Sequence, residues 1–116
     1  MTRRVRKGPG PAEAAAALER AGFGKRRVSV AEGFSARLLG LMFRKGMPED
    51  AALLIPGCNA IHTFFMRFAI DVAFLDRDGI PVKTVRGVRP WTPLVWGGFR
   101  ACAVAETQAN PAATRR

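Results

Sequence analysis

Few side chains in this sequence are suited to chemistry: one histidine, two cysteines and the carboxylate of Asp71, which follows Ile70. His62 is a side-chain type that titrates near neutral pH, so it suits proton transfer or ligand contact. Cys58 lies four residues before it, and Cys102 is the second thiol. A structural zinc site usually needs four ligands, and these three side chains include no Cys-x-x-Cys pair. We therefore expect no metal and no cofactor, and no nucleophile with its base is recognisable.

A candidate ligand-binding set can still be assembled. It consists of Arg37, Arg44, His62, Met66 and Asp71. Arg37 and Arg44 are seven positions apart, about two helical turns, so both can point the same way. Asp71 is expected to be at least half buried and paired with an arginine, with Arg37 or Arg44 favoured. His62 is expected at the edge of an aromatic pocket. The alternative is that both are structural, His62 as a core histidine and Asp71 as a turn cap.

The elements that must position these residues begin with helices and short strands. Residues 12–21 are strong helix formers, although one leucine among alanines gives this helix little to pack with. Val28–Val30 alternates like a strand. Phe34–Met42 places four apolar side chains on one helical face and predicts a second helix. Ala52–Ile55 is a short apolar run that ends at a Pro-Gly pair.

The following stretch has the composition of a sheet. Ile61–Phe65 is rich in aromatic residues and predicts a central strand, covered on both faces. Ile70–Leu75 and Ile80–Val88 flank Asp78-Gly79, a strong hairpin signal. Trp91–Gly98 predicts a loop whose Leu94, Val95 and Trp96 are buried anchors. Phe99–Glu106 predicts the last strand.

Length and charge set the domain organisation. The chain has 116 residues and a net charge of +10, and its composition is that of one globular domain. Residues 1–27 carry eight Lys or Arg against two Glu and are assigned to a basic arm with a short helix. Residues 28–106 form the globular domain, and residues 107–116 are expected to be a disordered tail. Most of the excess charge therefore lies outside the domain.

Location and partners follow from the same features. No apolar run is long enough to span a bilayer, and Gly8-Pro9-Gly10-Pro11 stands where the apolar core of an export signal would lie. We therefore expect a cytoplasmic protein with reduced thiols. The basic arm would attract nucleic acid weakly and without specificity, or it serves solubility alone.

Two spaced motifs carry a resemblance to a known family. The first is Gly40-Leu41-Met42-Phe43-Arg44, and the second runs from Ile61-His62-Thr63-Phe64-Phe65-Met66-Arg67 to Asp76, with Asp78-Gly79 directly after. Together they resemble the domain of unknown function 192 family, in a branch with an HTF-x-M-R element. The resemblance covers about residues 28–106 and implies no established activity. Family members continue with a leucine-glutamate strand and a closing segment. Here Glu106 stands in that strand, and the pattern is expected to stop at Thr107.

The sequence thus predicts an α+β domain, a small and mainly antiparallel barrel-like or sandwich-like sheet with one helix. A non-catalytic module that binds a small ligand or a partner is the favoured function. Three alternatives stay open. One is an enzyme that uses His62 and Asp71, and another is an assembly role through an open sheet edge. The third is a nucleic-acid binder that adds the charge of the arm to base stacking by exposed aromatic residues, namely Phe64, Phe65, Phe68, Trp91 and Trp96.

Overall fold

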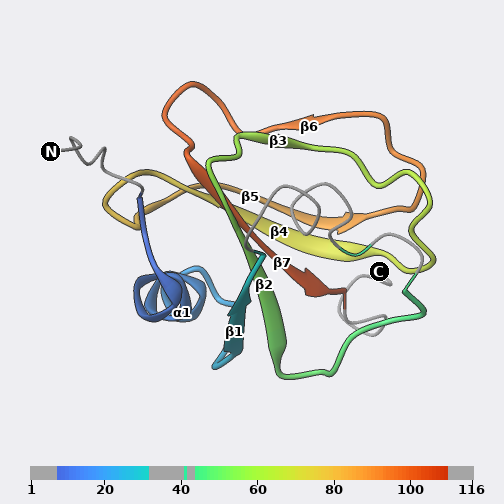
Figure 1. Cartoon of the computed structure of the whole chain (residues 1–116), viewed down its shortest axis with the longest axis horizontal. Coiled ribbons are helices and arrows are strands. Elements are labelled where there is room, and N and C mark those ends of the chain that lie inside the picture. Colours follow the sequence, from blue (N-terminus) through green and yellow to red (C-terminus); the bar gives the residue numbers. More distant parts are fainter. Residues whose placement is uncertain (1–7, 32–40, 42–43, 110–116) are drawn as a thin grey trace, which may run out of the picture.

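A computed structural model describes residues 8–31, 41 and 44–109 of the chain. Its main element is a five-stranded sheet in the order β1-β2-β7-β4-β5, and β3 and β6 pair separately as a two-stranded ribbon (Figure 1). The strands are β1 Arg27–Val30, β2 Ala51–Pro56, β3 Ala60–Ile61, β4 Ile70–Leu75, β5 Pro81–Val88, β6 Val95–Trp96 and β7 Ala103–Gln108. All pairs except β1–β2 are antiparallel. The α+β prediction with a mainly antiparallel sheet is confirmed, and the sheet is open.

Helix α1 (Pro11–Arg20) covers one face of this sheet, which we call the helix face. Pro11 occupies the first turn, and the Glu13 carboxylate accepts the N–H of Gly10 at 3.0 Å. Ala14, Ala17 and Leu18 repeat at helical spacing and are fully buried. They pack with small and branched side chains of β2, β4 and β7. The alanine-rich helix therefore has a packing partner that its own sequence does not reveal.

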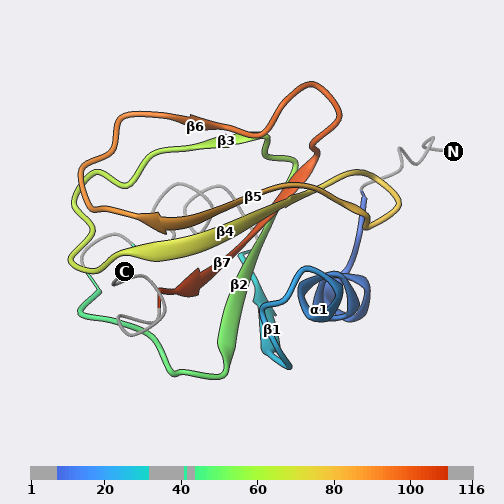
Figure 2. The same ribbon diagram turned by 180° about the vertical axis from the view of Figure 1, so that it is seen from behind.

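The β3–β6 ribbon covers the opposite face, which we call the ribbon face (Figures 1 and 2). Ile61 and Val95 pair across the ribbon and pack on the core that contains Phe74 of β4. Gly97, just after β6, lies so close to the Phe74 ring that a Cβ atom there would be 2.3 Å from the ring Cδ1. The absence of a side chain at position 97 thus allows the ribbon to approach the sheet.

The β4–β5 hairpin forms where the sequence predicts it, with Gly79 at φ +81° in the turn. A bulge interrupts its pairing, because Ile70 pairs with Val88 but Val72 pairs with Val85. Asp71 therefore faces two residues of β5, of which Gly87 has φ +64°. The Asp71 carboxylate accepts the Gly87 N–H at 2.8 Å, so it satisfies a donor within the irregular pairing.

Two predictions about the ribbon region are wrong. The expected strand Ile61–Phe65 ends at Ile61, because Phe65 has φ +65° and the chain turns there. It is not a central strand covered on both faces. The residues expected to be buried anchors, Leu94 and Trp96, are 65% and 43% exposed.

Other predictions concern the remaining segments. Strand β1 is confirmed, the helix expected over residues 12–21 is found at 11–20, and the last strand, expected over 99–106, is found at 103–108. The predicted helix over 34–42 lies outside the described residues, apart from Leu41, which is in a turn. The domain bounds at residues 28 and 106 stay a prediction. In the described ranges, no helix is long and apolar enough to cross a membrane.

Candidate binding surface

The structure distributes the predicted site residues over different parts of the fold. Arg37 lies outside the described residues, and Arg44 is exposed. Met66 is buried in the core beneath the ribbon face. His62 follows the ribbon strand β3 and is exposed. Asp71 points to the helix face, because its neighbours in β4, Ile70 and Val72, point to the ribbon face. The sheet therefore separates His62 from Asp71, and ligand binding by the set of five stays a prediction.

Asp71 is 3% exposed and pairs with an arginine, as expected, but the partner is Arg86. Its Oδ2 lies 3.1 Å from Nη1 of Arg86. The same guanidinium stacks 4.0 Å from the Phe23 ring centroid and donates to the Gly22 carbonyl at 3.1 Å. These contacts join β4, β5 and the end of α1, so Asp71 has a structural role.

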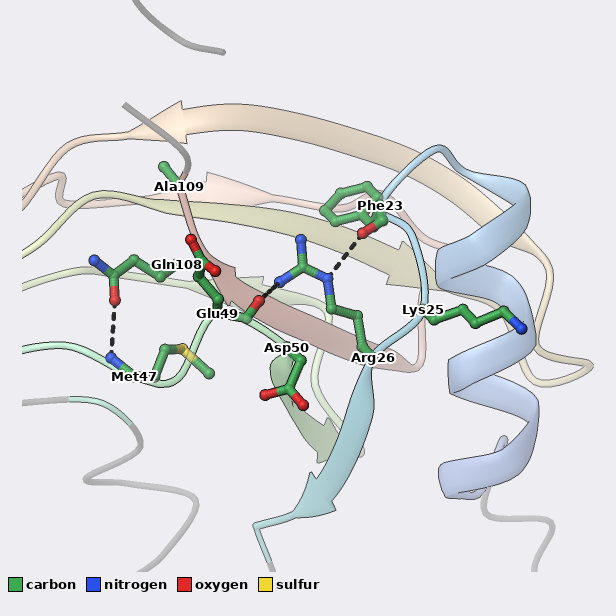
Figure 3. Close-up of a pocket in the computed structure, with 8 residues that line it drawn as sticks. All are labelled: Phe23, Lys25, Arg26, Met47, Glu49, Asp50, Gln108 and Ala109. Atoms are coloured by element: carbon green, nitrogen blue, oxygen red, sulfur yellow. Dashed lines mark hydrogen bonds between the residues drawn. The ribbon is translucent and has the colours of Figure 1, made fainter. Parts of the chain in front are cut away.

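A cavity of about 480 Å³ opens between the end of β7 and the segments before β1 and β2 (Figure 3). Much of its polar lining is already engaged within the protein. Arg26 donates to the carbonyls of Phe23 and Glu49 at 2.8 and 2.6 Å, and Gln108 accepts the Met47 N–H at 2.8 Å. The Arg27 guanidinium binds the Asp50 carboxylate through two hydrogen bonds and lowers its pKa. The cavity thus lacks exposed aromatic side chains, and its Arg26 and Gln108 already bind backbone groups.

Glu106 is a buried carboxyl group on the ribbon face of β7. It is 4% exposed, and its neighbours across the sheet are Leu53 of β2 and Val72 of β4. Burial in this apolar setting raises the pKa of Glu106 to about 7. The carboxyl therefore gains and loses its proton near neutral pH.

The most distinctive surface of the described protein is formed by the ribbon and its loops. We call it the aromatic surface, and it consists of His62, Phe65, Trp91, Leu94, Trp96 and Phe99. Five of these side chains are large and apolar, and they are between 43% and 91% exposed. Clustered exposure of this kind marks interaction sites more often than scattered single residues do.

One end of this surface is an aromatic cluster around Trp91. The Phe65 and Trp91 ring centroids are 4.8 Å apart, and Phe64 lies 5.9 Å from Trp91. His62 is 4.8 Å from Phe64, and its Nδ1 accepts the Phe64 N–H at 3.1 Å. With Nδ1 engaged in this bond, Nε2 is the other polar atom of the ring. His62 therefore lies at the rim of the cluster.

Both Phe65 and Trp91 have left-handed backbone, with φ of 65° and 66°. This conformation is uncommon for bulky residues. Buried Thr63 holds the two turns together. Its carbonyl accepts the Trp91 N–H at 2.8 Å, and its hydroxyl donates to the Arg89 carbonyl at 2.7 Å and accepts the Thr92 N–H at 2.8 Å. The cluster therefore stands on a tightly bonded backbone.

The other end of the surface is formed by Trp96 and Phe99, whose rings meet edge to face at 4.8 Å. Side chains alternate along a strand, and Ile61 and Val95 point to the core. The pair Ala60 and Trp96 therefore lies on the outer face of the ribbon. Phe99, in the loop after β6, is 91% exposed.

A groove of about 470 Å³ runs beside the first cluster. It is lined by the end of β5 and by the loop that follows, including Arg89, Trp91 and Thr92. The aromatic surface thus adjoins a concave region that contains a cation. Sequence reasoning names Phe65, Trp91 and Trp96 among the residues that could stack on a ligand if exposed, but it misses Phe99 and Arg89. The Pro- and Gly-rich composition of the loop was the only signal available for them.

In the described part of the chain, no group of three His, Cys, Asp or Glu side chains lies close enough to hold a metal ion. Cys58 Sγ donates to the Ala60 carbonyl at 3.0 Å, and the Cys102 carbonyl accepts the N–H groups of Gly57 and Cys58. The Cys102 carbonyl thus connects the residue before β7 with the segment between β2 and β3.

Comparison with known proteins gives a family and a fold. A family model described as DUF192, Uncharacterized ACR, matches residues 16–115. The match continues past Thr107, so the expectation that the family pattern stops there is wrong. UPF0127 protein PH1112 of Pyrococcus horikoshii is 44% identical over 69 residues, which are 55% of this chain and 57% of that protein. The matched stretch thus spans less than two thirds of this relative.

Two crystal structures share the fold. A protein of unknown function from Novosphingobium aromaticivorans aligns with a TM-score of 0.67 at 18% identity, over 79% of this chain and 71% of its own. A protein from Sinorhizobium meliloti, named "putative transcription regulator", aligns with a TM-score of 0.64 at 23% identity, over 71% of this chain and 67% of its own. At these identities the likeness is one of fold.

Proposed function

This chain belongs to the DUF192 family, whose description assigns no activity, and we propose that it is a non-catalytic binding module that uses the aromatic surface. The ligand contacts the planar faces of Phe65, Trp91, Trp96 and Phe99. His62 lies at the rim of this surface, where its Nε2 offers one polar contact.

One observation carries this proposal: Phe65 and Trp91 are bulky, exposed and in left-handed backbone. Such a conformation costs of the order of 1 to 3 kcal/mol per residue, and glycine would avoid most of that cost. Burial offsets only part of this cost, because the two side chains stay 46% and 56% exposed. Strained residues cluster at functional sites, and here the strain presents two rings to solvent.

An enzyme that uses His62 and Asp71 is less well supported. The two side chains lie on opposite sides of the sheet, and the Asp71 carboxylate is bound to Arg86 and Gly87. A shared reaction centre would need both groups at one position.

Tryptophan fluorescence tests the proposal, because Trp91 and Trp96 are the only two tryptophans of the chain. The full chain would be titrated with single-stranded oligonucleotides, neutral oligosaccharides, short peptides and phosphatidylserine vesicles. We expect one class to change the emission, and Phe65→Gly to weaken that response while leaving the circular dichroism unchanged. If all classes leave the emission unchanged, or if Phe65→Gly leaves binding intact, the proposal is wrong.

A further inference from the structure

The charge around the aromatic surface is of one sign. Residues 51–70 and 79–105, which include the ribbon and its loops, contain five Lys or Arg and no Asp or Glu. One of the five, Arg86, is bound to Asp71 on the helix face. The other four, Arg67, Lys83, Arg89 and Arg100, are exposed. This positive region is distinct from the basic N-terminal arm.

Each exposed cation is close in the sequence to an exposed ring or binds the backbone of a ring-bearing residue. Arg67 follows Phe65 by two residues, Arg89 precedes Trp91 by two, and Arg100 is adjacent to Phe99. Lys83 of β5 donates from Nζ to the Trp96 carbonyl at 2.7 Å. The exposed cations thus accompany the two ring clusters along the chain.

We infer that the ligand of the aromatic surface is single-stranded nucleic acid, an inference that rests on the proposed function. A single strand has repeated phosphates for the cations and exposed base faces for the rings, which is how sequence-tolerant single-strand binders work. A duplex stacks its base faces inside the helix and shows only base edges in its grooves. The groove at Arg89 and Trp91 accepts the strand beside the first ring cluster.

The spacing of the two ring clusters fits more than one base. Trp91 is hydrogen-bonded to Thr63, and Trp96 pairs with Ala60. Ala60 precedes Thr63 by three residues on the same segment. Three extended residues span about 10 Å. The clusters are therefore separate platforms, and one strand can place different bases on each.

Charge also argues against the other occupants. A second copy would bring four exposed cations against four exposed cations. A neutral sugar would leave those cations without a role. An anionic membrane would satisfy the charge, but membrane-surface binding typically uses an amphipathic helix with a continuous apolar face.

The test is fluorescence anisotropy with a labelled oligothymidylate about 12 nucleotides long, using the full chain. Trp91→Gly and Phe99→Ala each lower the affinity about 5- to 150-fold, the range for loss of one stacked base. Glycine at position 91 adopts the left-handed backbone without strain, and Phe99 is almost fully exposed. Both variants are therefore expected to fold. The matched control is Ile80→Ala, which removes an exposed apolar side chain from the β4–β5 turn and leaves the affinity unchanged.

Salt dependence separates the surface from the arm. Arg89→Ser and Arg100→Ser each reduce the slope of log affinity against log salt by about 0.7, the value for one phosphate contact on a single strand. Arg77→Ser, an exposed arginine in the hairpin turn, leaves the slope unchanged. Replacing Arg3, Arg4 and Arg6 together by Ser leaves Trp91 and Phe99 essential for binding.

Several results would overturn the inference. One is binding that depends on the arm substitutions and is insensitive to Trp91→Gly and Phe99→Ala. Another is equal affinity for duplex and single strand. If the oligonucleotide does not bind but a sugar, a peptide or a vesicle quenches the tryptophans, the ligand class is wrong and the binding module stands. If none of them binds, both are wrong.

Discussion

Two aromatic side chains occupy backbone that favours glycine, and this permits a direct test at the level of one residue. A non-glycine residue in left-handed backbone costs roughly 1 to 2 kcal/mol. We therefore expect Phe65→Gly to be more stable than Phe65→Ala by about 1 kcal/mol, because both lose the ring but only alanine keeps the strain. Urea denaturation midpoints of the two variants measure this difference.

Phe99 provides the control for that pair. It is exposed but does not have a positive φ. Phe99→Gly should therefore be no more stable than Phe99→Ala, since glycine only adds backbone entropy to the unfolded chain there. The same order of stability at both positions would show that residue 65 carries no backbone strain.

Asp71 tests the role of the bulge. Asp71→Ala removes the acceptor of the Gly87 N–H and the partner of Arg86, so the free energy of unfolding should fall by about 2 kcal/mol. Asp71→Asn keeps an oxygen for Gly87 and should cost less than about 1 kcal/mol, because the Arg86 side chain is 47% exposed and its ion pair is screened. Equal losses in the two variants would assign the effect to charge instead.

Glu106 predicts how stability depends on pH. Its pKa is about 7 in the folded protein and lies near 4.5 for an ordinary glutamate, so the folded state binds the proton more tightly. The stabilisation that comes from this tighter proton binding is fully present below pH 4.5 and is lost as the pH rises to about 7. The loss totals about 3 kcal/mol, since one pH unit between the two pKa values corresponds to about 1.4 kcal/mol.

The Glu106→Gln variant removes that titration. Its unfolding free energy should vary less with pH between 4.5 and 7 than that of the wild type, as measured by urea denaturation across this range. If the two pH profiles are parallel, Glu106 is not the group that titrates.

Residue identities could be predicted better than residue partners. The burial of Asp71 and its need for an arginine follow from the cost of burying a carboxylate, and both are confirmed. Which arginine pairs with Asp71 depends on the bulge at Gly87, because the bulge places Arg86 opposite Asp71. The register of two strands cannot be predicted from residue spacing along the chain. The same holds for Glu106, which sequence reasoning placed in a strand without its buried, apolar neighbours.

At the level of elements, the close approach of the ribbon to the sheet depends on Gly97. Gly97→Ala would place a methyl group 2.3 to 2.4 Å from the Phe74 ring, so we expect a loss of about 3 kcal/mol from overpacking. A second substitution, Phe74→Leu, should be less harmful in the Gly97→Ala background than alone. Additive losses in this double-mutant cycle would mean that the two residues do not meet.

Local signals explain which elements were predictable. The β4–β5 hairpin was found because its turn chemistry lies within a few residues, at Asp78-Gly79. The predicted strand Ile61–Phe65 is too long because aromatic composition favours a strand. The turn that ends it depends on the hydrogen bonds of Thr63 with Trp91 and Thr92. Those partners are about thirty residues away in the sequence.

For the whole molecule, net charge should control self-association. The chain carries +10 and exposes its aromatic surface within a region that lacks acidic residues. We expect a monomer at low ionic strength in sedimentation velocity, because like charges repel. At about 1 M salt the Debye length falls to about 3 Å, and dimers should appear in the wild type but not in Trp91→Gly. Dimers at low salt that disperse at high salt would contradict this.

Strand β7 lies at the centre of the sheet, between β2 and β4, yet it comes last in the sequence among the strands that the structure describes. During synthesis, β1–β2 and the β4–β5 hairpin can form early, but each keeps an open edge until residues 103–108 emerge. The two halves then close around β7. Completion of this fold is therefore expected after most of the chain has left the ribosome, and a nascent chain stalled before β7 would be a natural client for chaperones.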